Sequence, residues 1–107
     1  MTLTESRFEN LADEALGRMV DQLDDMEDEA FEAELESGVL SIRFSDGSTY
    51  VVNSHRAARQ IWMSADSVAW HFDWENGQWT AKKSGDEMWS TLSSRLSAKL
   101  GRSIQLK

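Results

Sequence analysis

The period of the apolar residues changes once near the start of the chain, and this change constrains the fold more than any other feature. Up to residue 24 the apolar side chains share one helix face at about 100° per residue. They are Phe8, Leu11, Ala12, Ala15, Leu16, Met19, Val20 and Leu23. From residue 31 the period becomes two, because Phe31, Ala33 and Leu35 alternate with glutamates. The pattern predicts a helix over residues 3–24, opened by a Thr2–Glu5 capping box, and then a strand over 31–36.

The rest of the chain predicts further strands and one more helix. Strand patterns cover residues 39–44, 48–53, 59–64, 69–74 and 78–83. The dipeptides "DG" at 46–47 and "NG" at 76–77 favour two-residue hairpin turns. A second helix is expected after a capping box formed by Ser84 and Glu87, with Gly101 as its C-cap. Its apolar stripe is Met88, Trp89, Leu92, Leu96 and Leu100, and "SIQL" at 103–106 is expected to run back as an extended tail.

The order of these elements predicts the fold class. Neither helix joins two strands, so a parallel α/β sheet is not implied. We therefore expect an α+β fold in which two terminal helices pack on one face of an antiparallel sheet, as an α-β sandwich. A chain of 107 residues is long enough for one core, and residues 1–107 are interpreted as a single domain.

Composition excludes several classes of protein. The chain has no cysteine, which rules out disulfides, thiolate metal sites and cysteine nucleophiles. No apolar run approaches the roughly 18 residues of a membrane span. The start, "MTLTESRFENLADEAL", has neither the regions of a signal peptide nor the arginine-rich character of a transit peptide. The sequence therefore predicts a cytoplasmic protein that does not associate with a membrane.

Acidic residues are concentrated in the first third of the chain. Residues 1–36 hold 13 Asp and Glu against two arginines, a net charge of −11, whereas residues 37–107 carry +3. Nucleic acid is therefore not expected as a partner, whereas cations or basic protein surfaces are. Asp24 and Asp25 stand at the end of the predicted helix, where the helix dipole disfavours negative charge. A local rule broken in this way often marks a functional site.

The acidic residues of the helix end, the following loop and the outward face of the strand are expected to adjoin one another. Carboxylates are hard oxygen ligands that suit Ca²⁺, Mg²⁺, Mn²⁺ and iron. An EF-hand is excluded, because Ala30 occupies the position of the required glycine and a strand follows instead of a helix. The residues themselves leave two interpretations open: a loose, weakly selective cation site, or an acidic face that serves solubility alone.

Histidines and catalytic motifs offer little. His55 and His71 lie on different predicted elements, and no third nitrogen or sulfur ligand accompanies them. No Ser-His-Asp arrangement, glycine-rich phosphate loop or isolated carboxylate pair suggests an enzyme. The tryptophans are more informative, because Trp89 is expected in the core, whereas Trp62 has the opposite parity to Ile61. Trp62 then points out from a sheet face that no helix covers, either as an interface anchor or half-buried by its neighbours.

The segments "GVL", "YVVN", "QIWMS" and "HFDW", in this order between an acidic helix and a Trp-bearing helix, resemble the frataxin family, most closely its bacterial CyaY branch. The resemblance covers nearly the whole chain and implies iron binding in iron–sulfur cluster assembly, with the cysteine desulfurase and the scaffold protein as partners. It places the family's iron ridge on eight residues, here named the acidic ridge: Asp21, Asp24, Asp25, Glu27, Asp28, Glu29, Glu32 and Glu34. It also assigns partner binding to Asn53 and Trp62. His55 departs from the family's usual glutamine, and the chain has no proline.

These observations predict an iron-binding accessory protein of iron–sulfur cluster assembly. The acidic ridge would bind Fe²⁺ or Fe³⁺ weakly, accept other divalent cations, and dock on the desulfurase. Such a protein is expected to be a monomer that iron drives into oligomers. The rival is a metal-independent acidic module that engages a basic partner. A ferroxidase is the weaker alternative, because nothing in the sequence holds two irons at defined positions.

Overall fold

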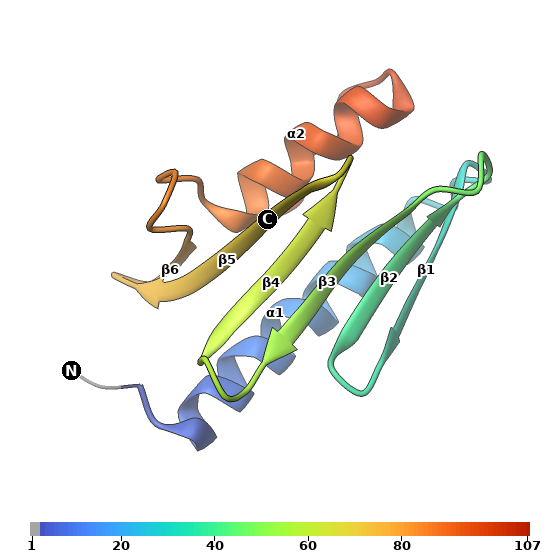
Figure 1. The fold of residues 1–107 in the computed structure, drawn as a ribbon. Helices are drawn as coiled ribbons and strands as arrows, with labels where there is room; N and C mark the ends of the chain where they lie inside the picture. The colour runs from blue at the N-terminus through green and yellow to red at the C-terminus, as the bar shows by residue number, and fades with distance from the viewer. Residues whose placement is uncertain (1–2) are drawn as a thin grey trace.

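The computed structural model describes residues 3–107, which form two helices and a six-stranded antiparallel sheet. In chain order the elements are α1 (Glu5–Asp25), β1 (Phe31–Glu36), β2 (Val39–Phe44), β3 (Thr49–His55), β4 (Gln60–Ala65), β5 (Val68–Glu75), β6 (Gln78–Thr80) and α2 (Met88–Leu100). Every strand pairs with its neighbour in sequence, so the spatial order is β1-β2-β3-β4-β5-β6 (Figure 1). No helix in this part of the chain is long and apolar enough to cross a bilayer.

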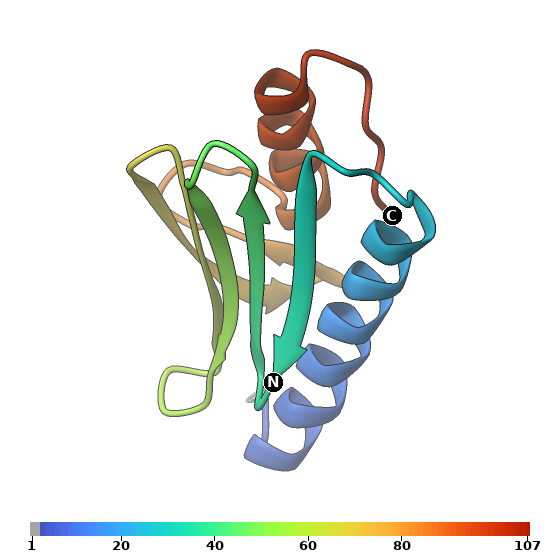
Figure 2. The same cartoon turned by 90° about the vertical axis from the view of Figure 1, so that its right-hand side faces the viewer.

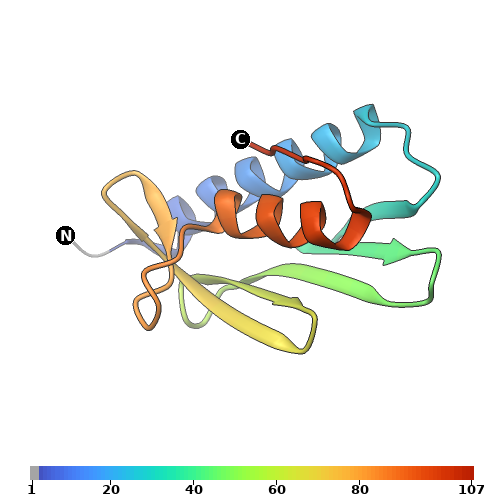
Figure 3. The ribbon, with the colours of Figure 1, turned by 90° about the horizontal axis from the view of Figure 1, so that it is seen from above.

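Both helices cover the same face of the sheet, and the other face is left open. Figures 2 and 3 show α1 and α2 side by side on one side of the strands, with the last residues of the chain beside α1. The predicted α+β sandwich is therefore confirmed. The α-β interface buries alternate residues of the central strands and one stripe of each helix. Fully buried examples are Leu16 and Met19 of α1, Ile42 of β2, Ile61 of β4 and Leu92 of α2.

The boundaries of α1 follow from its caps. The side chain of Thr4 accepts a hydrogen bond from the Arg7 N–H at 3.1 Å, which makes Thr4 the N-cap. Thr2, which the sequence pairs with Glu5 in a capping box, lies outside the described residues. The helix ends at Asp25, and its last turn holds no basic residue. The predicted conflict between two aspartates and the helix dipole is therefore present in the structure.

The capping box predicted at the start of α2 is wrong. Glu87 is itself the N-cap, and its carboxylate accepts hydrogen bonds from the N–H groups of Trp89 and Ser90. Glu87 also pairs with Thr80 in an isolated bridge, which holds its backbone extended. Ser84 instead bonds to Asp86 within a turn. Because residues 82–84 form a turn, β6 ends at Thr80 and does not reach residue 83.

The tail after Gly101 lies along α2 through serine side chains. Ser97 Oγ accepts a hydrogen bond from Ile104 N–H, and Ser93 Oγ accepts one from Leu106 N–H, both at 2.8 Å. The two serines are four residues apart on α2 and therefore face the same side. Their hydroxyl groups accept hydrogen bonds from the main chain of the tail, which a neighbouring strand would otherwise accept. The extended tail predicted over residues 103–106 is present, and it buries Ile104 and Leu106.

Candidate functional site

The acidic ridge is assembled from three consecutive pieces of structure. The end of α1 carries Asp21, Asp24 and Asp25, the loop carries Glu27, Asp28 and Glu29, and β1 carries Glu32 and Glu34. Glu27 has a positive φ of 48°, which turns the chain sharply after the helix. β1 can then run back beside the helix end, with Phe31 buried and its glutamates exposed.

Five members of the acidic ridge line one shallow groove of about 410 Å³. They are Asp24, Glu27, Asp28, Glu32 and Glu34. Asp21, Asp25 and Glu29 are exposed but do not line it. The α1 end, the loop and β1 therefore enclose a shallow depression.

Two arginines partly neutralise this groove. Arg43 of β2 lies 3.1 Å from Glu34 Oε2, and Arg102 forms an ion pair with Asp28. Asp28 also accepts the Ala30 N–H through its other oxygen at 2.8 Å, so both of its oxygens are engaged. Arg102 follows α2 and is 74 residues distant in sequence from Asp28. The sequence analysis predicted neither of these two ion pairs.

Three carboxylates of the groove remain without such partners. The carboxylates of Asp24, Glu27 and Glu32 form no ion pair and accept no hydrogen bond within residues 3–107. They come from the helix end, the loop and β1 respectively. In the described part of the chain, no three His, Asp or Glu side chains converge closely enough to hold a metal ion. The groove is therefore suited to hydrated cations held loosely, because a rigid cage is absent there.

A second group of candidate residues lies on the open face of the sheet. Asn53 of β3 and Trp62 of β4 are directly opposite each other in the register. Trp62 is half-buried, and its indole N–H donates to Gln60 Oε1 at 2.8 Å. Its outward direction, predicted from parity, is confirmed. β1 is two strand spacings from β3 and three from β4, about 10 and 14 Å, so Asn53 and Trp62 lie apart from the acidic ridge.

The two histidines, which share no predicted element, meet at Trp62. The His55 ring stacks on one side of the indole at a centroid distance of 3.8 Å, and the His71 ring stacks at 4.3 Å. Each imidazole lies 13° from the indole plane. The pairing of β4 with β5 would have predicted the contact between His71 and Trp62, because the two residues are directly opposite each other. We refer to His55, Trp62 and His71 as the ring stack.

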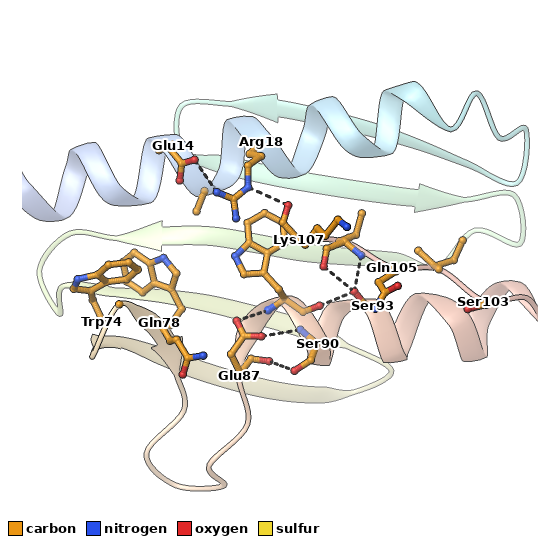
Figure 4. A pocket seen from close by; sticks show the side chains of 16 residues that line it. Glu14, Arg18, Trp74, Gln78, Glu87, Ser90, Ser93, Ser103, Gln105 and Lys107 are labelled. Carbon is orange, nitrogen blue, oxygen red and sulfur yellow. Dashed lines mark hydrogen bonds and ion pairs between the residues drawn. The ribbon is translucent and has the colours of Figure 1, made fainter.

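In a larger groove between the helices, the lining side chains bond to one another (Figure 4). It has a volume of about 630 Å³ and lies between α1, α2, the β5–β6 hairpin and the tail. Arg18 pairs with Glu14 at 2.9 Å and stacks over Trp89, while Glu87 caps α2. Trp89 is therefore only half-buried and lies at the rim of the core. The sequence, in contrast, predicts it inside the core. The polar groups of this groove hold the tail and the helices together.

Comparison with known proteins identifies relatives of this fold. A family model described as a frataxin-like domain matches residues 1–102. Frataxin from Psychromonas ingrahamii superposes with a TM-score of 0.88 at 20% identity, over 97% of this chain and 98% of that chain. Trimeric frataxin from the yeast Saccharomyces cerevisiae, complexed with ferrous iron, has a TM-score of 0.76 at 25% identity, over 85% and 86%. Another yeast frataxin structure gives 0.78 at 25% identity, over 94% and 85%.

Proposed function

Because the chain belongs to the frataxin family, we propose that it is an iron-binding accessory protein of iron–sulfur cluster assembly. The observation that carries this proposal is the groove in which the carboxylates of Asp24, Glu27 and Glu32 have no partner among residues 3–107. Ferrous and ferric ions are hard cations that prefer such oxygen ligands. The yeast frataxin complexed with ferrous iron supports the same ligand for this chain.

In this proposal iron is cargo held in an open site. Asp24, Glu27 and Glu32 supply the first carboxylates, and the other members of the acidic ridge add charge around them. Since no three side chains converge in the described residues, each ion keeps part of its water shell. Binding is therefore weak and poorly selective, and other divalent cations compete. Ions that bridge the ridges of separate copies would convert a monomer into oligomers, and the yeast frataxin complexed with ferrous iron is trimeric.

The experiment that tests iron binding is an anaerobic Fe²⁺ titration followed by NMR of the backbone amides. We expect line broadening confined to residues 21–36. Glu27→Gln should weaken it, whereas Asp13→Asn, which removes the same charge from an exposed position in the middle of α1, should not. Equal broadening in the two variants, or none in the acidic region of the unmodified protein, would contradict the proposal.

Docking on the cysteine desulfurase and the scaffold protein is the second part of the proposal. The acidic ridge would face a basic surface, and Asn53 with Trp62 would contact the partners on the open sheet face. Charge attraction of this kind weakens as salt rises. A pull-down with the desulfurase at low and high salt tests it, with Trp62→Ala and Glu27→Gln as separate probes of the two surfaces.

A metal-independent acidic module is the alternative that one observation favours. Asp28 binds Arg102 and Glu34 binds Arg43, so the acidic ridge already engages guanidinium groups of its own chain. Arginines of a partner would be recognised by the same chemistry. Partner binding that is unchanged after chelation of all metal supports this alternative, and binding that requires added Fe²⁺ excludes it.

A further inference from the structure

Three of the five tryptophans line the groove between the helices that Figure 4 shows. They are Trp74, Trp79 and Trp89. Within residues 3–107, none of their indole N–H groups has a hydrogen-bond acceptor, whereas both tryptophans outside the groove have one. Trp62 donates to Gln60 at 2.8 Å, and Trp70 donates to Asp86 at 3.0 Å. The indole N–H groups that lack an acceptor therefore belong to the tryptophans of this groove.

Trp79 is the clearest case, because its side chain is almost fully buried. It lies on β6 directly opposite Trp74, is 2% exposed, and its ring stands nearly perpendicular to that of Phe8 at a centroid distance of 5.9 Å. A buried indole N–H usually has an acceptor. No fully buried side-chain nitrogen or oxygen of residues 3–107 lacks a partner, so the Trp79 N–H is reached from outside. Since Trp79 lines the groove, this N–H opens into it.

The groove has the size and the walls of a site for a small molecule. Its volume of about 630 Å³ lies within the range of roughly 300–1,000 Å³ that is usual for such sites. The indole rings form much of its wall, and Ile104 and Leu106 of the tail add aliphatic surface. Figure 4 shows Trp74 of the hairpin at one end and Ser103 of the tail at the other. Aromatic walls favour a flat ring, which can stack on an indole or meet its edge.

The charged side chains that line the groove balance one another. They are Glu14, Arg18, Glu87 and Lys107. Arg18 pairs with Glu14 at 2.9 Å, and the carboxylate of Glu87 accepts two N–H groups at the start of α2. Two acidic and two basic side chains leave no net charge that would attract an ion of either sign. The structure therefore favours an uncharged ligand.

Hydrogen-bond donors outnumber acceptors among the groups of the groove that remain available. Besides the indole N–H groups, Arg18 Nη2 has no partner within residues 3–107, whereas one oxygen of Glu14 and both of Glu87 already accept hydrogen bonds. A sugar, whose hydroxyl groups each need an acceptor, would find few here. A carbonyl oxygen only accepts and an indole N–H only donates, so the two are complementary.

We propose that this groove binds a small, uncharged, planar ring compound that carries carbonyl oxygens, such as a cyclic imide. The indole N–H groups of Trp74, Trp79 and Trp89 would donate to the carbonyl oxygens, and the ring would lie against the indoles. No member of the acidic ridge lines the groove, and Asn53 and Trp62 do not line it either. The site is therefore separate from both surfaces of the proposed function and stands or fails independently of them.

The test is an NMR titration of the whole chain with N-methylphthalimide, a flat, uncharged ring system with carbonyl oxygens and no N–H donor. We expect the indole N–H signals of Trp74, Trp79 and Trp89 to shift, with a dissociation constant of about 1 mM or tighter. Those of Trp62 and Trp70 should stay in place. Indane, a similar ring system without carbonyl oxygens, should bind at least tenfold more weakly, and the dianion phthalate should also bind more weakly.

Three results of this titration would overturn the proposal. The first is the absence of shifts at the indole N–H groups of the groove, which would leave them to water alone. The second is equal binding of indane, which would show that apolar contact is sufficient. The third is tighter binding of phthalate, which would assign the groove to an anion.

Substitution of the donors gives a second measurement. Trp79→Phe keeps an aromatic ring but removes the N–H, and it should weaken the binding of N-methylphthalimide several-fold. Because Trp79 belongs to the core, Trp89→Phe at the half-buried rim is measured as well and should act in the same direction. Trp62→Phe, the same change on the open face of the sheet, should leave probe binding unaltered. Unchanged affinity in Trp89→Phe, or in a folded Trp79→Phe, contradicts the assigned role of the N–H groups.

Discussion

The imidazole of His55 lies flat on the indole of Trp62, with ring centroids 3.8 Å apart and planes 13° apart. His71 covers the opposite side of the same indole at 4.3 Å. Both sides of the Trp62 ring are therefore covered, and its indole N–H is bound to Gln60. The ring presents its edge to the open side of the sheet, in one orientation that the flanking rings hold.

Removal of one flanking ring should weaken docking more than folding. His55→Ala should lower affinity for the proposed partners, the desulfurase and the scaffold, by up to about tenfold, because one aromatic contact contributes roughly 0.5–1.5 kcal/mol. Trp62 would then change orientation more freely. His55→Gln keeps a planar group on the indole and is the matched control. Calorimetric titration measures the affinity, and NMR relaxation of the Trp62 indole N–H measures the mobility. Equal affinity of the alanine and glutamine variants would contradict the role.

Reversal of charge at the end of α1 should stabilise the isolated protein. Asp24→Lys places a cation where the helix dipole favours it, with an expected gain of about 0.3–1 kcal/mol in the free energy of unfolding. The same change should weaken Fe²⁺ binding, because it removes a carboxylate of the groove. Asp13→Lys alters the net charge equally in the middle of the helix and should leave iron binding intact. Urea denaturation gives the stability of each variant, and a destabilised Asp24→Lys would show that this carboxylate is structurally required.

Loss of Arg102 should increase the affinity of the acidic ridge for cations. Arg102 occupies one oxygen of Asp28, and Arg102→Gln releases that oxygen while removing a positive charge from the groove. Stability should fall by no more than about 1 kcal/mol, since the guanidinium is half exposed. Arg7→Gln removes the same charge at the other end of α1 and serves as the control. Isothermal titration with Mn²⁺ compares the two, and a lower affinity in Arg102→Gln would contradict the expectation.

The tail should depend on single hydroxyl groups of α2. Ser97 Oγ accepts the N–H of Ile104, whose side chain is 6% exposed. Ser97→Ala leaves that N–H without an acceptor, and we expect a loss of about 1–3 kcal/mol in the free energy of unfolding. Ser94→Ala, an exposed change on the same helix, should alter stability by less than about 0.5 kcal/mol. Hydrogen exchange at Ile104 should accelerate only in the Ser97 variant.

Alkaline pH should destabilise the fold through Tyr50. Burial, together with its hydrogen bonds to Asp66 at 2.8 and 2.9 Å, raises the pKa of Tyr50 above its ordinary value of 10.0. A raised pKa means that the folded protein retains a proton that the unfolded chain loses, so stability falls as pH rises above 10.0.

Tyr50→Phe tests this linkage directly. The variant should be less stable at neutral pH by about 1 kcal/mol, and the difference from the unmodified protein should shrink above pH 10. The chain has one tyrosine, so tyrosinate absorbance reports this residue alone. Parallel stability curves for the two proteins across that range would contradict the assignment. So would ionisation of Tyr50 at its ordinary pKa of 10.0.

The local pattern of residue types was sufficient to predict most of the fold. The change of period near residue 31 located the end of α1 and the start of β1, because helix and strand periodicity depend only on backbone geometry. The "NG" dipeptide at 76–77 predicted the β5–β6 hairpin for the same reason. The errors occur where a distant contact overrides local preference: the bridge from Thr80 to Glu87 moves the N-cap of α2 away from Ser84.

The sequence by itself determined the elements, their order and the acidic character of the α1–β1 region. Only the tertiary structure decided which charges meet, because packing brings together residues that no local period relates. It placed Arg102 on Asp28 and stacked His55 and His71 on Trp62. Periodicity reports which face of an element is buried, whereas the partners of an exposed side chain depend on how whole elements are arranged in space.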